Sequence, residues 1–301
     1  MSDRPLLCRD ESLALGEPQF GTASTVRRWI LIERDGPWGP TALKDNRFSP
    51  EVRVRLDVLR ETTGARVLMI RRHGRCEQRG VRVMVACTAP DYVWLEELRL
   101  ERIDDLFSRD LSPLRRGESV GADLIDDLRW FVCTHGKHDA CCAKYGRPVA
   151  EVLHARWPEQ TWETSHIGGD RFAGNVLVLP LGVYYGRVEP ERAVELIEQL
   201  RDGDLSLAHY RGRCSDPFDV QAAEWWVRQR RSLVGLDALA FRSHRHGDGG
   251  RSFTVFRLAD GRTLEVEIQR DVGPLRQLTC RAPSARRAPR FRLLGVTELE
   301  S

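Results

Sequence analysis

Residues 133–142 read CTHGKHDACC, which places three cysteines and two histidines within ten positions. Thiolates and imidazoles are ligands for zinc, copper and iron–sulfur centres, and an activated thiolate also takes part in disulfide exchange. Cys133 and Cys142 are separated by eight residues with Gly136 between them, so a folded-back loop can bring both sulfur atoms to one point. Because neighbouring residues on a helix diverge by about 100°, only one of Cys141 and Cys142 is expected to face that point. The segment therefore predicts half of a metal or redox site.

The segment SHIGGDRFAGN, residues 165–175, offers the other half of such a site. His166 and Asp170 both carry metal-ligating atoms, and the two glycines between them allow the backbone to turn tightly. The alternative is that His166 ends a strand and Asp170 caps a helix or a turn. The histidines at positions 135 and 138 are interpreted as hydrogen-bonding or exposed residues, although either one could replace Asp170 as a ligand.

The elements around these motifs alternate between strands and helices. An apolar strand over 127–133 leads into the cysteine-rich loop, and a helix over 141–158 follows. Asp139 is expected to cap this helix, and Gly146 and Pro148 are positions at which it could bend. A short strand over 160–167, two strands within 174–188 and a helix over 189–203 complete the unit. This order of elements is that of a thioredoxin-like fold.

A related order precedes this unit. A strand over 24–34, a helix after Ser49 with Pro50 at its first position and Gly64 at its end, and strands over 65–72 and 80–88 predict an α/β layer. The two strands are separated by a turn around 74–80, and residues 92–106 have a mixed pattern that suits a strand or a helix. Residues 108–124 are polar and turn-rich and are predicted to form a linker. The similar order of the two units suggests an internal duplication.

The C-terminal part has a different pattern. An amphipathic helix is predicted over 219–235, followed by strands within 251–270 that are joined by a hairpin turn at Asp260 and Gly261. Residues 275–283 also resemble a strand, and the arginine-rich residues 281–292 are interpreted as a solvated loop. The predicted divisions of the chain are 1–120, 121–208 and 209–301.

The composition excludes several classes of protein. The 301 residues include 47 basic and 44 acidic side chains, so the net charge is only +3, which disfavours a nucleic-acid binder. No apolar run approaches the roughly 18 residues of a membrane helix, and the first residues lack the pattern of a secretory signal. We therefore expect a cytoplasmic protein without a membrane partner, in which disulfides rarely persist. Scattered cysteines such as Cys87 are interpreted as buried apolar residues.

The motifs CTHGKHDACC, HIGGDRFAGN and YYGRV, with RRWILIERDGPWG near the N-terminus, together resemble the sucrase/ferredoxin-like family over roughly residues 8–205. The family is related to thioredoxin-like [2Fe-2S] ferredoxins. The resemblance implies an α/β protein in which residues 121–208 form a thioredoxin-like ferredoxin domain. A related α/β region, 1–120, precedes this domain, and a small α+β extension of helix and strands, 209–301, follows it.

In the ferredoxins of this group, two cysteines in an early loop and a later C-x-x-x-C pair hold the cluster, and some eukaryotic relatives place H-x-x-x-H at the later pair. The resemblance thus implies a [2Fe-2S] cluster bound by Cys133, Cys142, His166 and Asp170, with Cys141 as an alternative ligand. An aspartate at the last position departs from both patterns. Two thiolates, one imidazole and one carboxylate give an oxidised centre a formal charge of about −1, which predicts a potential between the plant-type and Rieske classes.

The resulting hypothesis is a ferredoxin-like electron carrier, rather than an enzyme with catalytic residues, which exchanges electrons with a reductase or an acceptor protein. A second hypothesis is a thiol–disulfide redox protein that uses Cys133 and Cys142, although the chain lacks C-x-x-C spacing there. A third is an adaptor stabilised by zinc at the same ligands, because zinc accepts cysteine, histidine and aspartate.

Overall fold

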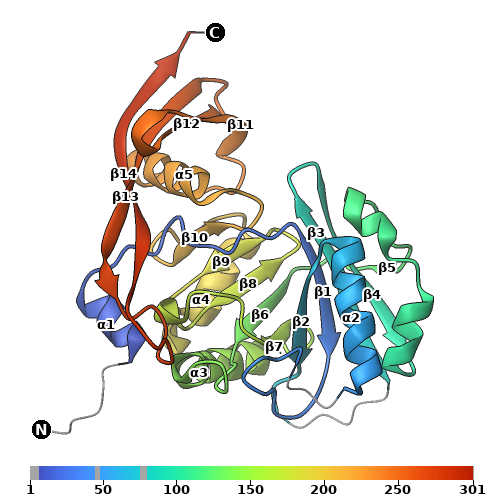
Figure 1. Cartoon of the computed structure of the whole chain (residues 1–301). Helices are drawn as coiled ribbons and strands as arrows, with labels where there is room; N and C mark the ends of the chain where they lie inside the picture. Colours follow the sequence, from blue (N-terminus) through green and yellow to red (C-terminus); the bar gives the residue numbers. More distant parts are fainter. Residues whose placement is uncertain (1–6, 45–47, 75–79, 301) are drawn as a thin grey trace, which may run out of the picture.

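The computed structural model describes residues 7–44, 48–74 and 80–300, and its main feature is a ten-stranded mixed sheet (Figure 1). The strand order in this sheet is β10-β9-β8-β6-β7-β2-β1-β3-β4-β5. The strands are β1 (Arg28–Glu33), β2 (Arg66–Arg71), β3 (Val81–Ala89), β4 (Tyr92–Leu100), β5 (Asp123–Leu124), β6 (Arg129–Cys133), β7 (Thr161–Thr164), β8 (Val176–Leu179), β9 (Val183–Tyr185) and β10 (Tyr210–Arg213).

The sheet consists of two halves with the same topology. In one half the order is β4-β3-β1-β2, and in the other it is β9-β8-β6-β7. The first two strands of each half are parallel and are joined by a helix, α2 (Pro50–Thr63) or α3 (Ala140–Arg156), as a parallel crossover requires. The halves meet where β2 pairs antiparallel with β7. The similarity of the two units that the sequence suggested therefore extends to the order and direction of their strands.

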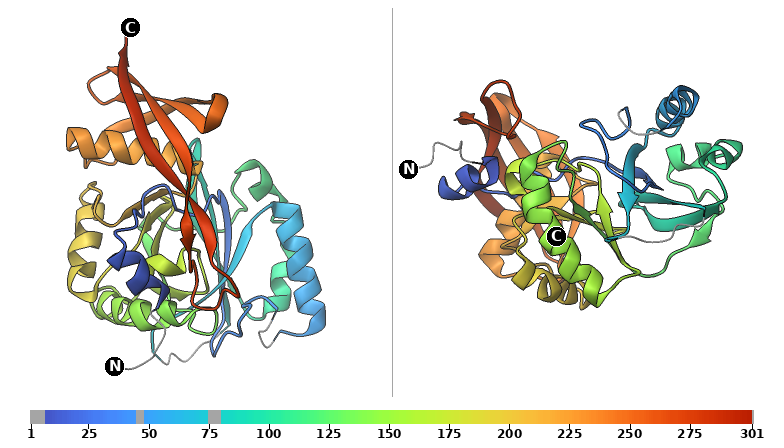
Figure 2. Two further views of the ribbon diagram at one scale, coloured as in Figure 1. Left: turned by 60° about the vertical axis from the view of Figure 1, so that its left-hand side comes forward. Right: turned by 90° about the horizontal axis from the view of Figure 1, so that it is seen from below.

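Helices and buried side chains divide the molecule into layers. Helix α2 and two 3-10 helices, η1 (Ile103–Ser108) and η2 (Ser112–Arg116), cover one face of the first half, whereas α3 and α4 (Pro190–Arg201) cover one face of the second. The opposite faces of both halves contribute to one shared core, which includes Trp29, Phe131 and Trp162. Figure 2 shows these helices on the outside of the central sheet. The fold is thus mixed α/β, with a thioredoxin-like order of elements in its second half.

Local signals account for the helix ends. The side chain of Ser49 accepts a hydrogen bond from the backbone N–H of Val52, Pro50 occupies the first turn, and Gly64 ends α2 with φ 66°. Helix α4 buries Ala193 and Leu196 together with two further apolar residues on the same face, as its periodicity predicted. These two predicted helices are confirmed.

Two sequence predictions in the first half need correction or completion. The polar segment 108–124 is not a linker, because Leu111 and Leu114 are buried against the sheet and β5 pairs with β4. Residues 92–106, which had an ambiguous pattern, form β4 and then η1. The predicted turn between β2 and β3 lies partly outside the described residues.

The C-terminal part combines helix α5 (Phe218–Arg231) with a four-stranded antiparallel sheet. Its strands are β11 (Leu239–His246), β12 (Arg251–Leu258), β13 (Thr263–Arg276) and β14 (Arg286–Leu299), and a 3-10 turn η4 (Asp248–Gly250) precedes β12. The hairpin turn at Asp260 and Gly261 joins β12 to β13, as predicted. The long β13–β14 hairpin runs from this sheet along the second half of the molecule to the neighbourhood of α1 (Cys8–Ala14) and α3 (Figures 1 and 2).

The arginine-rich segment 281–292 is not a solvated loop over its whole length. Residues from Arg286 onward belong to β14, and residues 277–285 form the turn between the two long strands. Arg292 pairs with Gln269 and Arg286 with Arg276, with one shift of register between the two pairs. This pairing explains the difference, because an edge strand can pair its backbone while its charged side chains remain in solvent. The strand-like interpretation of 275–283 is correct only for its first two residues.

Among the described residues, no helix combines the length and the apolar character that a membrane crossing needs.

Candidate metal centre

The cysteine-rich loop connects β6 to α3. Cys133 is the last residue of β6, and Cys142 lies in the first turn of α3, so both sulfur atoms are fixed by regular elements. The loop between them folds back through hydrogen bonds from Gly136 N to Thr134 O (2.8 Å) and from Asp139 N to His135 O (3.1 Å). The carboxylate of Asp139 then caps α3 by accepting from the N–H of Cys141 at 2.8 Å, as the sequence predicted.

Gly146 determines how closely α3 approaches β6. A Cβ atom at this position would lie 2.0 Å from the carbonyl oxygen of Cys133. The backbone of α3 therefore packs directly on the end of β6, and this contact brings Cys142 to Cys133. Both cysteines are buried in the core that the two halves of the sheet share.

His166 and Asp170 come from the segment after β7, which makes a tight turn at two glycines with positive φ, Gly168 at 102° and Gly169 at 80°. Asp170 begins a short 3-10 helix, η3 (Asp170–Phe172). The fully buried guanidinium of Arg211 holds this turn by donating to the carbonyl of Gly168 at 3.1 Å. A Cβ atom at residue 169 would lie 2.4 Å from the same guanidinium, so this position requires glycine.

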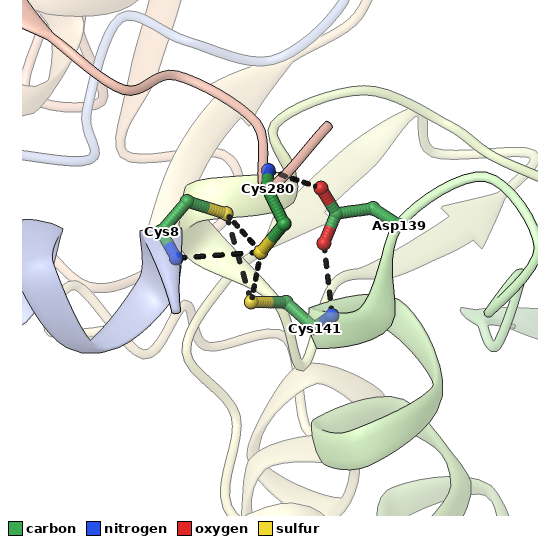
Figure 3. A group of neighbouring side chains, drawn as sticks. All are labelled: Cys8, Asp139, Cys141 and Cys280. Carbon is green, nitrogen blue, oxygen red and sulfur yellow. Dashed lines mark hydrogen bonds between the residues drawn. The ribbon is translucent and has the colours of Figure 1, made fainter. Parts of the chain in front are cut away.

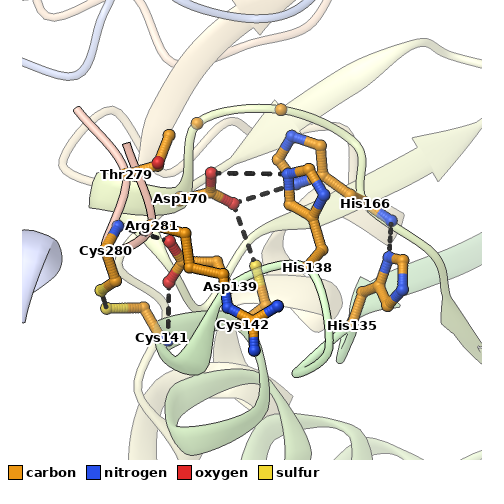
Figure 4. A network of polar contacts seen from close by, with 12 residues as sticks. His135, His138, Asp139, Cys141, Cys142, His166, Asp170, Thr279, Cys280 and Arg281 are labelled. Carbon is orange, nitrogen blue, oxygen red and sulfur yellow. Dashed lines mark hydrogen bonds and ion pairs between the residues drawn. The ribbon is translucent and has the colours of Figure 1, made fainter. Parts of the chain in front are cut away.

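The two segments place their metal-ligating atoms together, as Figure 4 shows. The Sγ atom of Cys142 lies 3.2 Å from Oδ1 of Asp170, and Nδ1 of His166 lies 3.0 Å from the same oxygen. The ligand atoms of Cys133, Cys142 and His166 all lie within 4.8 Å of one another. Asp170 is 2% exposed, whereas the side chain of His166 retains 23% exposure. The site is therefore buried on the side of its sulfur and carboxylate atoms and reaches solvent at one imidazole.

The contact between His166 and Asp170 is of the kind that two ligands of one metal ion make. The Nδ1 atom of His166 is buried and has no hydrogen-bond partner of acceptable direction, although Oδ1 of Asp170 is only 3.0 Å away. Both atoms can bind a cation, and a metal ion would replace the proton that the imidazole carries beside this carboxylate. The donor set of two thiols, an imidazole and a carboxylate also fits iron or zinc.

The charges of the four groups depend on one another. Hydrogen bonding from Cys142 lowers the pKa of Cys133 against the effect of burial, and the resulting thiolate raises the pKa of Cys142. Burial disfavours charge on His166, but the contact with Asp170 and the sulfur of Cys133 raises its pKa to about 9. Burial likewise opposes ionisation of Asp170, yet the nearby imidazole lowers the pKa of this carboxyl. The site thus stabilises the ionised thiolate and carboxylate that a metal centre requires, and metal binding would release protons from Cys142 and His166.

The two histidines of the loop have different positions. His135 is buried, its Nε2 lies 2.7 Å from the carbonyl of Gly39, and its Nδ1 accepts from the backbone N–H of His166 at 3.2 Å. It therefore positions the second segment, in agreement with its interpretation as a hydrogen-bonding residue. His138 stacks on His166 with 3.8 Å between ring centroids, and its Nε2 lies 3.8 Å from Oδ2 of Asp170. The geometry makes His138 a candidate ligand beside Asp170.

Cys141 does not lie with these groups. Its sulfur belongs to a separate group with the sulfur atoms of Cys8 and Cys280, on the other side of the first turn of α3 (Figure 3). This placement agrees with the expected divergence of two consecutive helical residues. It gives no support to Cys141 as an alternative ligand of the first group, which consists of Cys133, Cys142, His166 and Asp170. The convergence of positions 8, 141 and 280 was missed in the sequence because the residues are so far apart along the chain.

Comparison with known proteins identifies the family. A family model described as sucrase/ferredoxin-like matches residues 19–212, which is more than half of the chain. The chain therefore belongs to the sucrase/ferredoxin-like family. The matched region contains all four residues of the first group as well as Cys141, but it contains neither Cys8 nor Cys280.

Similarity to individual proteins is lower. Altered inheritance of mitochondria protein 32 from Candida glabrata is 30% identical over 111 residues, which cover 31% of this chain and 34% of the fungal protein. The protein of the same name from Meyerozyma guilliermondii is 32% identical over 101 residues, covering 30% of this chain and 36% of that protein. The chain thus spans about a third of the length of these curated relatives.

Among solved structures, a cysteine-to-serine variant of the thioredoxin-like [2Fe-2S] ferredoxin from Aquifex aeolicus matches with 24% identity and a TM-score of 0.24. The match covers 28% of this chain and 97% of the ferredoxin.

Proposed function

We propose that this member of the sucrase/ferredoxin-like family is an iron–sulfur electron-transfer protein that holds a [2Fe-2S] cluster with Cys133, Cys142, His166 and Asp170. The observation that carries the proposal is the meeting of two loops about two dozen residues apart at one mostly buried place. The ligand atoms of Cys133, Cys142 and His166 lie within 4.8 Å of one another, and Asp170 contacts Cys142 and His166. When bound, a cluster of this kind supplies a one-electron redox couple.

The surroundings suit the proposal. Cys133 and Cys142 lie in an apolar core, which limits access of water and of oxidants to the sulfur atoms. His166 is the partly exposed member, and it lines a pocket of about 300 Å³ together with His135, His138 and the loop around residues 40–43. We propose that electrons exchange with a partner protein at this pocket, because it is where the site reaches the surface.

Asp170 has a specific consequence in this proposal. Its carboxylate adds a negative charge that a second histidine would not, and negative charge at the centre stabilises the oxidised state. The potential is therefore expected to lie below that of a bis-histidine centre and above that of an all-thiolate one. His138, 3.8 Å from Asp170, supplies an alternative imidazole if the carboxylate dissociates.

A single metal ion is the second candidate, and the compactness of the site favours it. The ligand atoms of Cys133, Cys142 and His166 lie within 4.8 Å of one another, and a tetrahedral zinc site with bonds of about 2.0–2.3 Å separates its ligands by roughly 3.3–3.8 Å. A zinc-stabilised adaptor would use the same side chains without any redox change. The number of metal ions and the presence of sulfide distinguish the two candidates.

The test is anaerobic purification and reconstitution, followed by measurement of iron and acid-labile sulfide and by absorption and EPR spectra. The proposal predicts about two irons and two sulfides per chain and a reducible chromophore. Cys133→Ser should abolish both, while the control Cys87→Ser, at a buried cysteine of β3, should retain both. A colourless protein without iron or sulfide, whose zinc content falls by about one ion per chain in Cys133→Ser, would support the adaptor instead. A metal-free protein that forms a reversible disulfide between Cys133 and Cys142 would support the thiol redox alternative.

A further inference from the structure

A second group of metal-ligating side chains lies beside the first and is not used by the proposed electron carrier. It contains Cys8 at the start of α1, Cys141 in the first turn of α3, and Cys280 in the turn between β13 and β14 (Figure 3). Their sulfur atoms are 3.6 Å apart for Cys8 and Cys141, 3.4 Å for Cys141 and Cys280, and 3.5 Å for Cys280 and Cys8. Three parts of the chain separated by more than a hundred residues therefore bring three thiols to one point.

The dimensions of this triangle fit a mononuclear thiolate site. Zinc–sulfur bonds of about 2.3 Å in a tetrahedron give edges of roughly 3.8 Å between sulfur atoms. The observed separations are a few tenths of an ångström shorter and nearly equal. They are far longer than the roughly 2.05 Å of a disulfide bond, so no pair is joined covalently.

Asp139 provides a fourth ligand atom and fixes two of the cysteines. A carboxylate oxygen of this fully buried residue lies within 4.8 Å of all three sulfur atoms. Its Oδ1 accepts from the N–H of Cys141 at 2.8 Å, and its Oδ2 accepts from the N–H of Cys280 at 2.6 Å. Each oxygen keeps a second lone pair that can bind a cation.

A backbone hydrogen bond to sulfur completes the group. The N–H of Cys8 donates to Sγ of Cys280 at 3.4 Å. Such donors stabilise thiolates at metal centres. The two backbone donors satisfy one lone pair on each oxygen of the fully buried Asp139, but they do not balance its negative charge, which a bound cation would.

We propose that Cys8, Cys141, Cys280 and Asp139 form a zinc site that is distinct from the proposed cluster site. Binding displaces the protons of the thiols and gives a four-coordinate S₃O centre, a donor set that zinc accepts. The consecutive residues Cys141 and Cys142 then serve different sites, since they diverge around the axis of α3.

The zinc site attaches the C-terminal extension to the loop that carries the first group. The turn at 277–285 already contacts this loop through the bond from Cys280 to Asp139 and through Arg281, whose guanidinium donates to the carbonyl of Lys137. Figure 4 shows Thr279, Cys280 and Arg281 beside the first group of ligands. Zinc would therefore hold helix α1 and the end of the long hairpin against the first turn of α3.

The test measures zinc and iron in the same anaerobically reconstituted protein. We expect about one zinc per chain in the wild type. Cys280→Ser should lower the zinc content at least fivefold and leave iron and sulfide unchanged, whereas Cys133→Ser should remove iron and sulfide and leave zinc unchanged. The control Cys87→Ser should change neither metal. Equal zinc content in the wild type and Cys280→Ser would overturn the proposal, whatever the iron content.

A second measurement on the wild type does not depend on the folding of a variant. The reduced protein is treated with a zinc chelator or with added Zn²⁺, then alkylated and analysed by mass spectrometry. Zinc should slow the alkylation of Cys8, Cys141 and Cys280 at least tenfold, and it should lower hydrogen exchange in residues 277–285. Equal alkylation rates with and without zinc would show that the three thiols are a packing cluster only.

Discussion

Gly146 offers the sharpest test of how the first group is assembled. Replacing a glycine in the middle of a helix by alanine normally stabilises the helix by about 0.5–1 kcal/mol. In Gly146→Ala the added methyl group would start 2.0 Å from the carbonyl oxygen of Cys133 and 3.1 Å from its carbonyl carbon. We therefore predict the opposite sign, a loss of stability, together with displacement of Cys133 from Cys142.

The magnitude follows from the geometry. An ordinary contact between carbon and oxygen is roughly 3.4 Å, so α3 must move away from β6 by on the order of 1 Å or more. Such overpacking costs about 1–3 kcal/mol. The gain of about 0.5–1 kcal/mol in helix propensity offsets less than half of a cost of about 3 kcal/mol. The net expectation is a decrease of about 1–2 kcal/mol in the free energy of unfolding, with most of the bound iron lost.

The assay is urea denaturation of the reconstituted protein, combined with iron and sulfide analysis. Glu151→Ala, at an exposed position of the same helix, is the matched control and should leave both quantities within error. If Gly146→Ala were as stable as the wild type and retained its metal content, the close backbone contact between α3 and β6 would not be what brings the two cysteines together.

Three further predictions concern charged side chains that are buried or partly buried. Asp170→His removes one negative charge about 4 Å from the centre. The interaction of two unit charges at that distance is about 4 kcal/mol at an effective dielectric constant of 20, so the midpoint potential should rise by on the order of 100–200 mV. A redox titration that shows an unchanged or lower potential would exclude Asp170 as a ligand. In Arg211→Lys, loss of the bonds to Gly168 and Asn175 should cost about 2–4 kcal/mol of unfolding free energy and lower the iron content, and a wild-type denaturation midpoint would contradict this role. Burial raises the pKa of Asp216 to about 6, so the folded state binds this proton more tightly than the unfolded state, and stability should fall as pH rises from about 4 to about 6. Asp216→Asn should remove that dependence and stabilise the protein by about 1–3 kcal/mol at pH 7 but not at pH 4, and equal effects at both pH values would refute the assignment.

Much of the fold could be predicted from local sequence. Ser49 and Gly64 cap helix α2 at its two ends, and both could be predicted because capping and positive φ are properties of single residues. The apolar face of α4 follows from a simple period. The joining of the two halves into one sheet could not be predicted. It depends on the pairing of their outer strands, β2 and β7, and nothing in the local sequence of either strand indicates its partner. The arginine-rich strand β14 was misjudged for a similar reason, since its partner β13, rather than its composition, determines its conformation.

The candidate site was predictable to the extent that its ligands lie in short motifs. The spacing of Cys133 and Cys142 and the glycine-containing turn before Asp170 both appear in the structure. The position of His138 near Asp170 was harder to predict, because it depends on the contact of the loop with the carbonyl of Pro40. Likewise, the hydrogen bonds that hold the glycine turn come from Arg211, and no motif near position 170 indicates this residue.

The division between the two proposed sites follows the boundary of the family match. Residues 19–212 contain every ligand of the proposed cluster but only Cys141 and Asp139 of the zinc site. The remaining thiols, Cys8 and Cys280, lie on either side of that region and reach it through α1 and the long hairpin. The zinc site is therefore built where the flanking segments of this chain meet the family core, at the helix that also positions Cys142. In this arrangement the two proposed sites would differ in role as well as in metal: the proposed cluster would exchange electrons within the core, and the proposed zinc ion would fix the flanking segments beside it.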